Sequence, residues 1–415
     1  MTSPPSILVT GTIDRPDIIA ILRDARSQAR FTFLEYSFHH GSRSHPEYYA
    51  GYGPLRFWNE FRHANALLDE IRPDKIVFFY VNSLNQVALN LVARQRGIRT
   101  YHLEHGFRQR YEETVEGEVE QKQSRKARFD PLKLQREFRD IAGNHAFFAR
   151  SVLGLEGTKR RALARFGYEI YVHGPSTHVL RRYAAIRQPD RYVSFSPECF
   201  EFHRVQDDLT AADMARVEHV GLPQFDHLAA LPQAKVDPRN VVLVDHSLHQ
   251  HGIYGWTPEF RTTWVRKIYD IIRQLDLKLW VKQHPFDSSA AWAPYLDSGH
   301  VEVVDSERLA AIIPSTGMVL GLYSTMQLPL AAMAHVAFIT LEIHPRPPRL
   351  YASQPFIDAG VAAAATDFDQ LSAMMARRDH LLEVQVPAKP AFIRQFLHRM
   401  DGESGARLRD AILHG

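Results

Sequence analysis

Two short polar segments in the second half of the chain carry residues suited to binding phosphate. Lys282-Gln283-His284-Pro285 follows an apolar run and combines a cation with an imidazole, while the proline sets the direction of the turn. Further along, Ser324 and Thr325 precede a helix-like stretch at 328–334. Ser and Thr are preferred helix N-caps, and a helix N-terminus presents free N–H groups to an anion. The ordinary alternatives are a strand-end histidine that is hydrogen-bonded to a backbone carbonyl and a Ser-Thr pair that only caps a helix. Because the two segments follow consecutive strands, a phosphate site is favoured.

Two further segments place carboxylates where strands are expected to end. Glu104 opens Glu104-His105-Gly106, and it can act as a general base toward an acceptor hydroxyl. Its ordinary alternative is a helix cap, with the glycine making the turn. Asp245 opens Asp245-His246-Ser247, and it can act as the nucleophile of a double displacement. His246 and Ser247 are then expected to bind the donor.

Three residues of the first half are weaker candidates for lining a ligand site. His105 would lie at the same sheet edge as Glu104. Glu198 can act as an acid or a base, although a solvated loop acid is the simpler interpretation. Gly11 ends the first apolar run and permits close approach of a ligand, although most such glycines only make turns.

A metal site is the alternative interpretation of the histidines that follow Asp245. His246, His249 and His251 are spaced as H-x-x-H-x-H, which matches no strong zinc signature. We therefore expect neither a metal nor another cofactor.

Apolar runs that alternate with helix-like stretches must position these residues. We expect strands at 6–11, 31–36, 75–80, 99–103, 168–172, 217–221, 240–244, 277–282, 301–304, 318–323 and 337–341. We expect helices at 16–30, 55–71, 85–96, 257–274 and 390–414. Continuous apolar strands separated by helices predict parallel sheets covered on both faces.

The same pattern predicts two doubly wound α/β domains. The first spans 1–228 and contains a polar, helical insertion at about 108–165, and a connector at 229–239 leads to the second at 240–389. The last segment, 390–415, is expected to pack back on the domains. Ligands of α/β proteins bind at the carboxyl ends of the strands, which here would face a cleft.

The second half resembles the GT-B glycosyltransferases of bacterial capsule and lipopolysaccharide synthesis, including sialyl- and Kdo-transferases. Those families carry a His-Pro motif and a downstream Ser-Ser/Thr motif that hold the nucleotide phosphate, matched here by His284-Pro285 and Ser324-Thr325. CDP-glycerol transferases share a similar pair. In the first half the resemblance rests mainly on Glu104-His105-Gly106, where sialyltransferases have two acidic residues before the glycine. Asp245 is similar in outline to the arrangement of retaining β-Kdo transferases.

The resemblance implies a GT-B fold, in which two Rossmann-like domains face a cleft, and metal-independent transfer from a nucleotide sugar. We expect a sugar such as Kdo or another ulosonic or nonulosonic acid to pass from its CMP donor to a bacterial surface polysaccharide or lipopolysaccharide. A CDP-polyol phosphotransferase and a UDP-sugar 2-epimerase of the same fold remain alternatives. A non-catalytic subunit that binds a glycan or a nucleotide sugar is the alternative from another class.

Composition excludes several other classes. The net charge is only +3 over 415 residues, which is not the basic field of a nucleic-acid-binding protein. Cys199 is the only cysteine, and no signal-like segment or long apolar run is present, so we expect a cytoplasmic protein. No P-loop, nucleophile elbow or H-E-x-x-H motif occurs.

Basic residues cluster in the insertion and suggest an anionic partner. The clustered residues are Arg108, Arg110, Lys122, Arg125, Lys126, Arg128, Lys159, Arg160, Arg161 and Arg165. Such clusters suit an anionic glycan or lipid headgroups, although solvated helix faces explain most charge runs. Peripheral association with the inner face of the cytoplasmic membrane is the expectation that follows.

Overall fold

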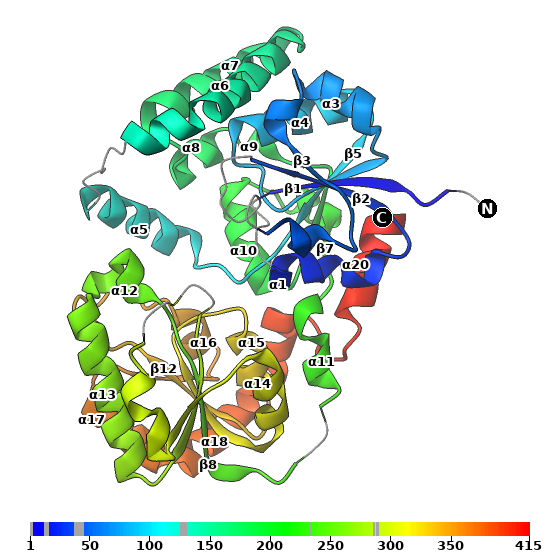
Figure 1. Ribbon diagram of the computed structural model, residues 1–415. Helices are drawn as coiled ribbons and strands as arrows, with labels where there is room; N and C mark the ends of the chain where they lie inside the picture. Colours follow the sequence, from blue (N-terminus) through cyan, green and yellow to red (C-terminus); the bar gives the residue numbers. More distant parts are fainter. Residues whose placement is uncertain are drawn as a thin grey trace. The chain divides into compact units, whose positions relative to one another are not determined.

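The chain forms two compact units. The computed structural model describes residues 3–11, 16–36, 45–124, 131–231, 234–284, 287 and 290–415 (Figure 1). The first unit comprises Met1–Gln224 and Glu403–Gly415, and the second comprises Phe225–Gly402. The chain crosses between them in the short helix η5 (Pro223–Phe225), ahead of the expected connector.

The first unit is built on a seven-stranded sheet in which all neighbouring strands pair in parallel. Its order is β3 (Leu55–Phe57), β2 (Arg30–Glu35), β1 (Ser6–Thr10), β4 (Lys75–Phe78), β5 (Arg99–Leu103), β6 (Arg191–Ser194) and β7 (Val217–His219). The central strands β1 and β4 are almost wholly buried, as their continuous apolar sequences predict. The α/β prediction is therefore confirmed for this unit.

Helices cover this sheet and form the insertion. They are α1 (Pro16–Ile19), η1 (Ala20–Ala25), η2 (Pro46–Tyr49), η3 (Trp58–Glu60), α3 (Ala64–Ile71), α4 (Leu84–Gln95), α5 (Tyr111–Ser124), α6 (Pro131–Leu153), α7 (Gly157–His173), α8 (Thr177–Arg182), α9 (Ala184–Arg187), α10 (Pro197–Gln206), η4 (Ala212–Arg216) and α20 (Ser404–His414). Helix α6 lies along α7 (Figure 1), and α20 packs on η1.

Two predictions of secondary structure in this unit are wrong. The expected strand at 168–172 is the end of helix α7, because Leu163, Phe166 and Ile170 recur at helical spacing and pack in the core. The expected helix at 55–71 begins with strand β3, which pairs with β2, and becomes helical only from Ala64.

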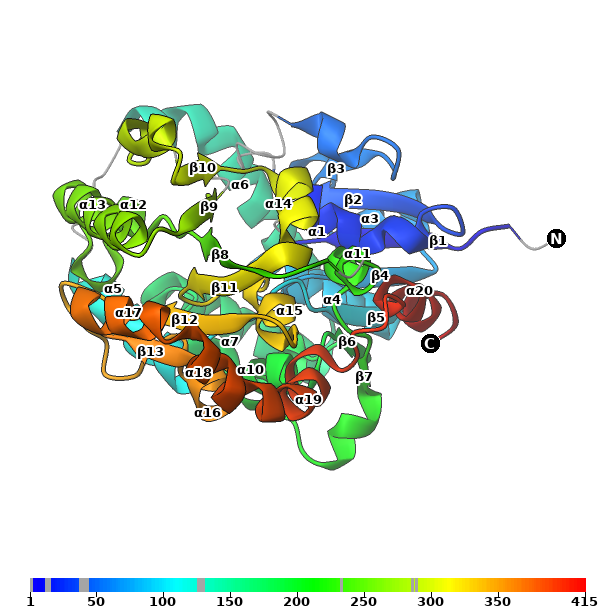
Figure 2. The same ribbon diagram turned by 90° about the horizontal axis from the view of Figure 1, so that it is seen from below.

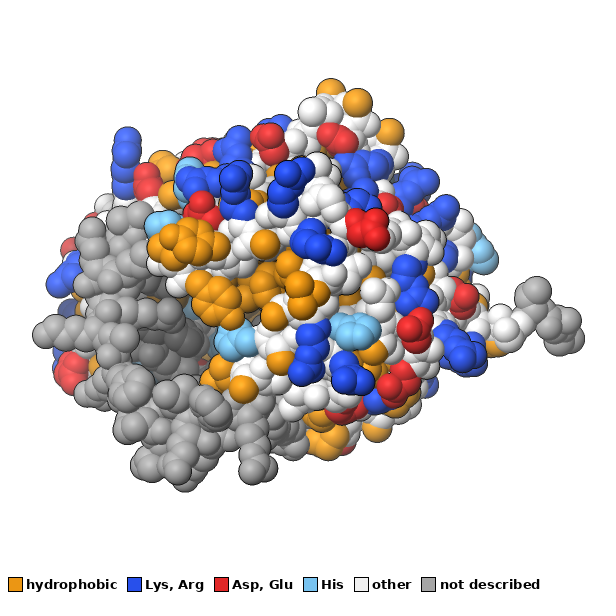
Figure 3. All heavy atoms as spheres, turned by 90° about the horizontal axis from the view of Figure 1, so that it is seen from above, with side chains coloured by type: hydrophobic (Ala, Val, Ile, Leu, Met, Phe, Trp, Pro, Cys, Tyr) orange, Lys and Arg blue, Asp and Glu red, His pale blue; other side chains and the backbone are white. Residues whose placement is uncertain are grey.

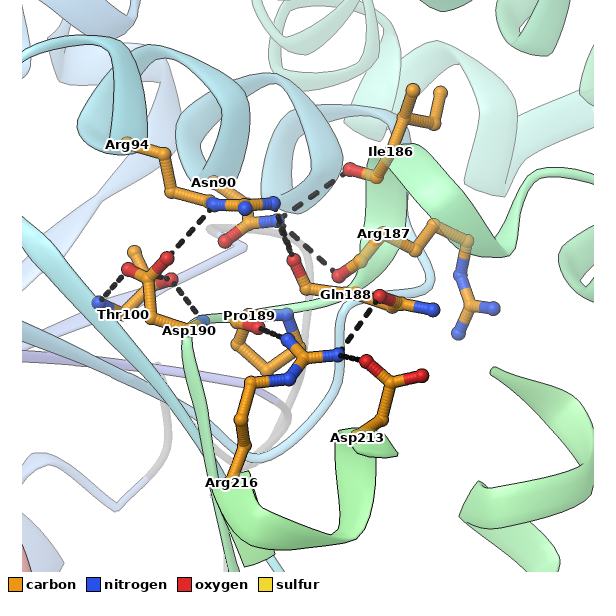
Figure 4. A network of polar contacts seen from close by, with 10 residues as sticks. All are labelled: Asn90, Arg94, Thr100, Ile186, Arg187, Gln188, Pro189, Asp190, Asp213 and Arg216. Carbon is orange, nitrogen blue, oxygen red and sulfur yellow. Dashed lines mark hydrogen bonds and ion pairs between the residues drawn. The ribbon is translucent and has the colours of Figure 1, made fainter. Parts of the chain in front are cut away.

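A polar network fixes the loop that leads into β6 (Figure 4). The carboxylate of Asp190 accepts hydrogen bonds from the backbone and hydroxyl of Thr100 at 2.9 and 3.1 Å, and it pairs with Arg94 at 3.0 Å. The amide of Asn90 donates to the carbonyls of Arg187 and Gln188 at 3.2 and 3.1 Å. The network connects α4 and β5 to the start of β6. It therefore helps to fix the position of β6 and of the residues that follow it.

The second unit contains a six-stranded parallel sheet. Figure 2 shows its strands in the order β10 (Val301–Val303), β9 (Lys278–Lys282), β8 (Asp237–Val244), β11 (Thr316–Gly321), β12 (Ala337–Leu341) and β13 (Ala363–Ala365). Every strand expected in this half is present. The sequence did not predict β13, because alanine has little preference for strands.

The helices of this unit lie on both faces of its sheet. They are α11 (Asp226–Ala229), α12 (Leu248–His251), η6 (Ile253–Gly255), α13 (Pro258–Gln274), η7 (Ala293–Ser298), α14 (Ser306–Ile312), η8 (Ile313–Ser315), α15 (Gln327–Ala332), α16 (Gln354–Asp358), α17 (Phe368–Ala376), α18 (Arg378–Gln385), η9 (Val386–Ala388), α19 (Lys389–Phe392) and η10 (Ile393–Leu397). Helices α13 and α17 lie on one face and α14 and α15 on the other (Figure 1). The single helix expected at 390–414 is divided, because the π-helical turn η10 ends at His398 with a φ of 61°.

Candidate functional site

Four neighbouring strands of the second unit deliver the predicted donor-binding residues to one edge of its sheet. The strands lie in the order β9, β8, β11, β12, and because they are parallel their carboxyl ends share an edge. Asp245, His246 and Ser247 follow β8, and Lys282 ends β9 with His284 two residues on. Ser324 and Thr325 follow β11 at the same edge. Pro285 lies outside the described residues.

The Asp245 carboxylate is buried and fully engaged in hydrogen bonds. Its Oδ1 accepts from Nη1 of Arg261 and from the backbone N–H of His246, both at 2.8 Å. Its Oδ2 accepts from Nε1 of Trp292 at 2.8 Å and from Nη2 of Arg261. The carboxylate therefore accepts four hydrogen bonds, two of them from Arg261, with which it forms a buried ion pair.

Arg261 is the partner that sequence reasoning missed. The residue is 1% exposed, lies on α13, and also approaches Oδ2 of Asp287 at 3.4 Å. Its guanidinium lies 5.3 Å from the ring of Trp264. A signal existed, because Arg261 occupies the apolar stripe of α13 that continues with Trp264, Val265 and Ile268. A cation in such a stripe needs a buried anion.

His246 links the loop after β8 to the loop after β11. Its Nε2 donates to the carbonyl oxygen of Tyr323 at 2.6 Å, and the two rings stack with centroids 6.0 Å apart. Burial lowers the pKa of His246, so the imidazole is neutral at physiological pH. The neutral ring with a fixed Nε2–H therefore positions Tyr323, directly before Ser324.

The turn before α15 differs from the cap that was expected. The N-cap of α15 is Met326, and the Ser324 hydroxyl accepts a hydrogen bond from the Met326 N–H at 3.3 Å. Ser324 and Thr325 therefore form the preceding turn and do not cap the helix. The side chain of Gln327 packs on Gly321, where an added Cβ would lie 1.6 Å from Nε2 of Gln327. Close packing of the strand end on the helix requires this glycine.

The segment after β9 is half-buried. Lys282, Gln283 and His284 are each partly exposed, and the carbonyl of Lys282 accepts the Asp245 N–H at 3.0 Å. The carbonyl of His284 accepts the Asp287 N–H at 2.9 Å, which connects this loop to the Arg261 pair. One ion-pair network therefore supports the loops after β8 and β9.

A second buried network, also missed by the sequence, follows β12. Glu342 accepts from Nε2 of His344 at 3.0 Å and from the backbone and hydroxyl of Ser353. Nδ1 of His344 accepts from Nε1 of Trp256 at 3.0 Å. Glu342 is 1% exposed and Ser353 is fully buried, so the network braces the loop after β12.

The first unit gathers polar groups at the carboxyl ends of β4, β5 and β6. We define the β5 cluster as Tyr80, His102, Glu104, His105, Arg108 and His203. Glu104 is fully buried, with Oε2 3.2 Å from Nε2 of His203 and Oε1 3.7 Å from Nε of Arg108. Neither carboxylate oxygen has a hydrogen-bond partner of good geometry among the described residues. A buried carboxylate of this kind is costly and is typical of a functional site.

The histidines of the β5 cluster are neutral. Burial, reinforced by Arg108, lowers the pKa of His203 to about 3, and burial likewise holds the pKa values of His102 and His105 well below 6.5. His105 bonds through Nε2 to the hydroxyl of Tyr80, while its Nδ1 has no hydrogen-bond partner in the described part of the chain. A neutral imidazole with an unpartnered nitrogen can accept a proton.

The other two candidates of the first unit, Glu198 and Gly11, have contacts within the protein that explain them without a ligand. Glu198 lies in the first turn of α10, 3.7 Å from Nη2 of Arg110. Gly11 has a φ of +148°, and a Cβ there would lie 2.8 Å from Cβ of Phe79. Packing between strands accounts for this glycine without a ligand.

The described residues contain neither a metal-binding cluster nor a helix suited to span a membrane. No group of three or more His, Cys, Asp or Glu side chains is arranged to hold a metal ion. None of the described helices combines the length and the apolar character needed to cross a bilayer.

Two parallel doubly wound units are the architecture of the GT-B fold, and comparison with solved structures agrees. The glycosyltransferase of kitacinnamycin is 13% identical over 99% of this chain and 98% of its own, with a TM-score of 0.51. The wall teichoic acid polymerase TagF with CDPG is 10% identical over 99% of this chain and 88% of its own, with a TM-score of 0.52. UDP-GlcNAc 2-epimerase from Neisseria meningitidis, bound to UDP-GlcNAc, is 9% identical over 99% and 100%, with a TM-score of 0.51.

At these identities the likeness shows the shared fold. No protein family matches the sequence, and no curated protein is similar to it in sequence.

Proposed function

We propose that the chain is a glycosyltransferase that moves a sugar from a nucleotide-activated donor to a glycan or glycolipid acceptor in the cytoplasm, without a metal ion. One observation carries the proposal. The two phosphate-suited segments follow β9 and β11, the two neighbours of β8 in one parallel sheet. That is the edge at which α/β proteins bind nucleotides.

Lys282, His284, Ser324 and Thr325 are assigned to the donor phosphate. As the glycosidic bond breaks, negative charge builds on the leaving phosphate, and preorganised donors stabilise that charge most strongly. The buried Arg261–Asp245 pair and His246 support the loops that carry these residues.

Asp245 is assigned a positioning role. Each of its oxygens already accepts two hydrogen bonds, so attack on a sugar would require the carboxylate to give up contacts with Arg261 or Trp292. A covalent sugar–enzyme adduct, detected by intact-protein mass spectrometry and lost in Asp245→Asn, would instead establish the nucleophilic role.

Acceptor activation is assigned to the β5 cluster. His105 is the proposed general base, because its imidazole is neutral and Nδ1 has no hydrogen-bond partner among the described residues. Nδ1 is buried, so this role requires acceptor binding to displace the side chains that cover it. Proton transfer from the acceptor hydroxyl to Nδ1 generates the nucleophile. Glu104 is fully buried beside His203 and Arg108, and is proposed to stabilise the charge that develops on the imidazole.

The donor sugar proposed is Kdo or another ulosonic or nonulosonic acid linked to CMP, supported by the His284-Pro285 and Ser324-Thr325 motifs. A second candidate keeps the fold and changes the donor to a CDP-polyol or a UDP-sugar. It is favoured by the likeness to TagF with CDPG and to the 2-epimerase with UDP-GlcNAc.

Mass spectrometry of products formed from CMP-, CDP- and UDP-linked donors tests the proposal. Donor-dependent transfer or hydrolysis is expected for one nucleotide, and the nucleotide that raises the melting temperature identifies the class. Nucleotide binding with neither transfer nor hydrolysis across a broad acceptor panel would replace the enzyme with a binding subunit.

A further inference from the structure

The outer side of helix α7 exposes large apolar side chains in an unusual concentration. Tyr168, Tyr171 and Val172 are 66%, 59% and 53% exposed. Because residues three and four apart share a helix face, these three project from the same side of α7. We call this surface the α7 face.

Packing within the unit covers only part of this surface. The ring of Tyr171 lies 5.3 Å from that of His145 on α6 and its hydroxyl is hydrogen-bonded to Nδ1 of His145, yet the residue stays 59% exposed. The opposite side of α7 packs Leu163 and Phe166 into the core, and a Cβ at Gly167 would lie 2.7 Å from the ring of Phe148. Large apolar side chains left in water after the core is complete mark an interaction surface.

Cations accompany the apolar residues. Arg161 and Arg165 are exposed and continue the stripe toward the start of α7. Neither has an acidic partner among the described residues, and the nearby Glu169 is paired with Arg182 at 3.1 Å. Figure 3 shows hydrophobic side chains gathered among Lys and Arg side chains on this side of the molecule.

We propose that the α7 face docks on the surface of a membrane that contains anionic lipid. Tyrosine suits the boundary between headgroups and acyl chains, since its ring is apolar and its hydroxyl is polar. Basic residues beside an apolar stripe add attraction to anionic headgroups, and two such signals together give stable surface binding. A second copy of the chain fits less well, because an isologous contact would bring cation against cation.

Only some of the basic residues predicted from the sequence to meet an anionic partner belong to the α7 face. Arg108 lies against the rings of Tyr80 and Phe202, and Arg110 lies near Glu198, so we assign neither to the membrane-binding surface. Arg125, Lys126 and Arg128 lie outside the described residues, as does the side chain of Lys122. Among the described residues of the cluster, those of α7 supply the exposed charge. The proposal stands independently of the transferase assignment.

Vesicle flotation with the full chain tests the proposal. The protein is expected to float with vesicles containing phosphatidylglycerol and to stay behind with phosphatidylcholine alone. Tyr168→Ser/Tyr171→Ser should weaken binding at least about tenfold. Arg161→Gln/Arg165→Gln should weaken it about 25-fold, on the basis of about fivefold for each cation.

Matched substitutions on other exposed helix positions serve as controls. Val384→Ser on α18 removes an apolar side chain that is 61% exposed, and Arg266→Gln/Lys267→Gln on α13 removes two exposed cations. Both controls should bind anionic vesicles as the unchanged protein does. Circular dichroism establishes that each variant is folded.

A fluorescent label at the α7 face supplies a second measurement. Val172→Cys creates an accessible thiol, since the single native cysteine, Cys199, is 1% exposed. The emission of a polarity-sensitive dye at position 172 should shift to shorter wavelength with anionic vesicles. Absence of both flotation and shift overturns the proposal, as does equal binding by the α7 variants. A dimer in light scattering that the tyrosine variants dissociate assigns the face to self-association and also overturns it.

Discussion

The ion pair between Asp245 and Arg261 makes the most quantitative prediction. Their side chains are 1% and 2% exposed and form two charge-assisted hydrogen bonds. Removing one partner of a buried pair costs about 3–5 kcal/mol, because a buried charge is left uncompensated. Asp287 lies 3.4 Å from the guanidinium and offsets part of that loss. We therefore expect Asp245→Asn to lower the free energy of unfolding of the second unit by about 3 kcal/mol.

Urea unfolding followed by tryptophan fluorescence measures this loss. A loss of 3 kcal/mol corresponds to a fall of about 6–12 °C in melting temperature for a unit of this size. Asp237→Asn is the matched control, because Asp237 pairs with Arg239 on the surface and should contribute less than about 1 kcal/mol. Replacing both charges, as Asp245→Leu/Arg261→Met, should recover only part of the stability, because it leaves the His246 N–H and the Trp292 Nε1–H without their acceptor and removes the cation beside Asp287. A loss below about 1 kcal/mol in Asp245→Asn would refute the positioning role.

Three further predictions concern His203, Gly321 and His105. The folded-state pKa of His203 is about 3, so the unfolded chain binds more protons below its ordinary pKa of about 6.5, and stability falls as pH drops between these values. His203→Gln should flatten the stability curve between pH 6 and 4 by about 1.4 kcal/mol per pH unit, and parallel curves would contradict this. Gly321→Ala should destabilise the second unit by about 1–3 kcal/mol in thermal unfolding, and the double variant with Gln327→Ala should regain part of it, because the added Cβ meets Gln327. His105→Ala should lower kcat at least about 100-fold with little change in donor binding, whereas an unchanged kcat would exclude it as the base.

The positions at which the strands end could be predicted, because a strand is indicated by a short apolar run of neighbouring residues. Continuous apolar runs such as 99–103 and 277–282 predicted strands, and the parallel arrangement then placed the following polar residues at one edge of each sheet. The same pattern predicts that Lys282, His284 and Ser324 lie at one edge of the second sheet.

The misses have a common cause, which is that tertiary packing decides between local alternatives. Residues 168–172 alternate as a strand would, yet the spacing of core residues from 163 onward makes them helical. The roles of Arg261 and Glu342 depend on partners outside the local pattern: Arg261 pairs with Asp245, 16 residues away, and Glu342 accepts from Ser353, 11 residues further on. Local sequence cannot reveal which anion meets a buried cation.

The most direct test of the central claim is calorimetric titration of CMP, CDP and UDP into the full chain and two histidine variants. His284→Ala removes a proposed phosphate ligand, and His380→Ala removes an exposed imidazole on α18 as the control. We predict that one nucleotide binds the unchanged protein and His380→Ala equally, and binds His284→Ala at least about tenfold more weakly, the loss of one charge-assisted hydrogen bond. Equal binding by His284→Ala, or no binding of any nucleotide, would contradict the account.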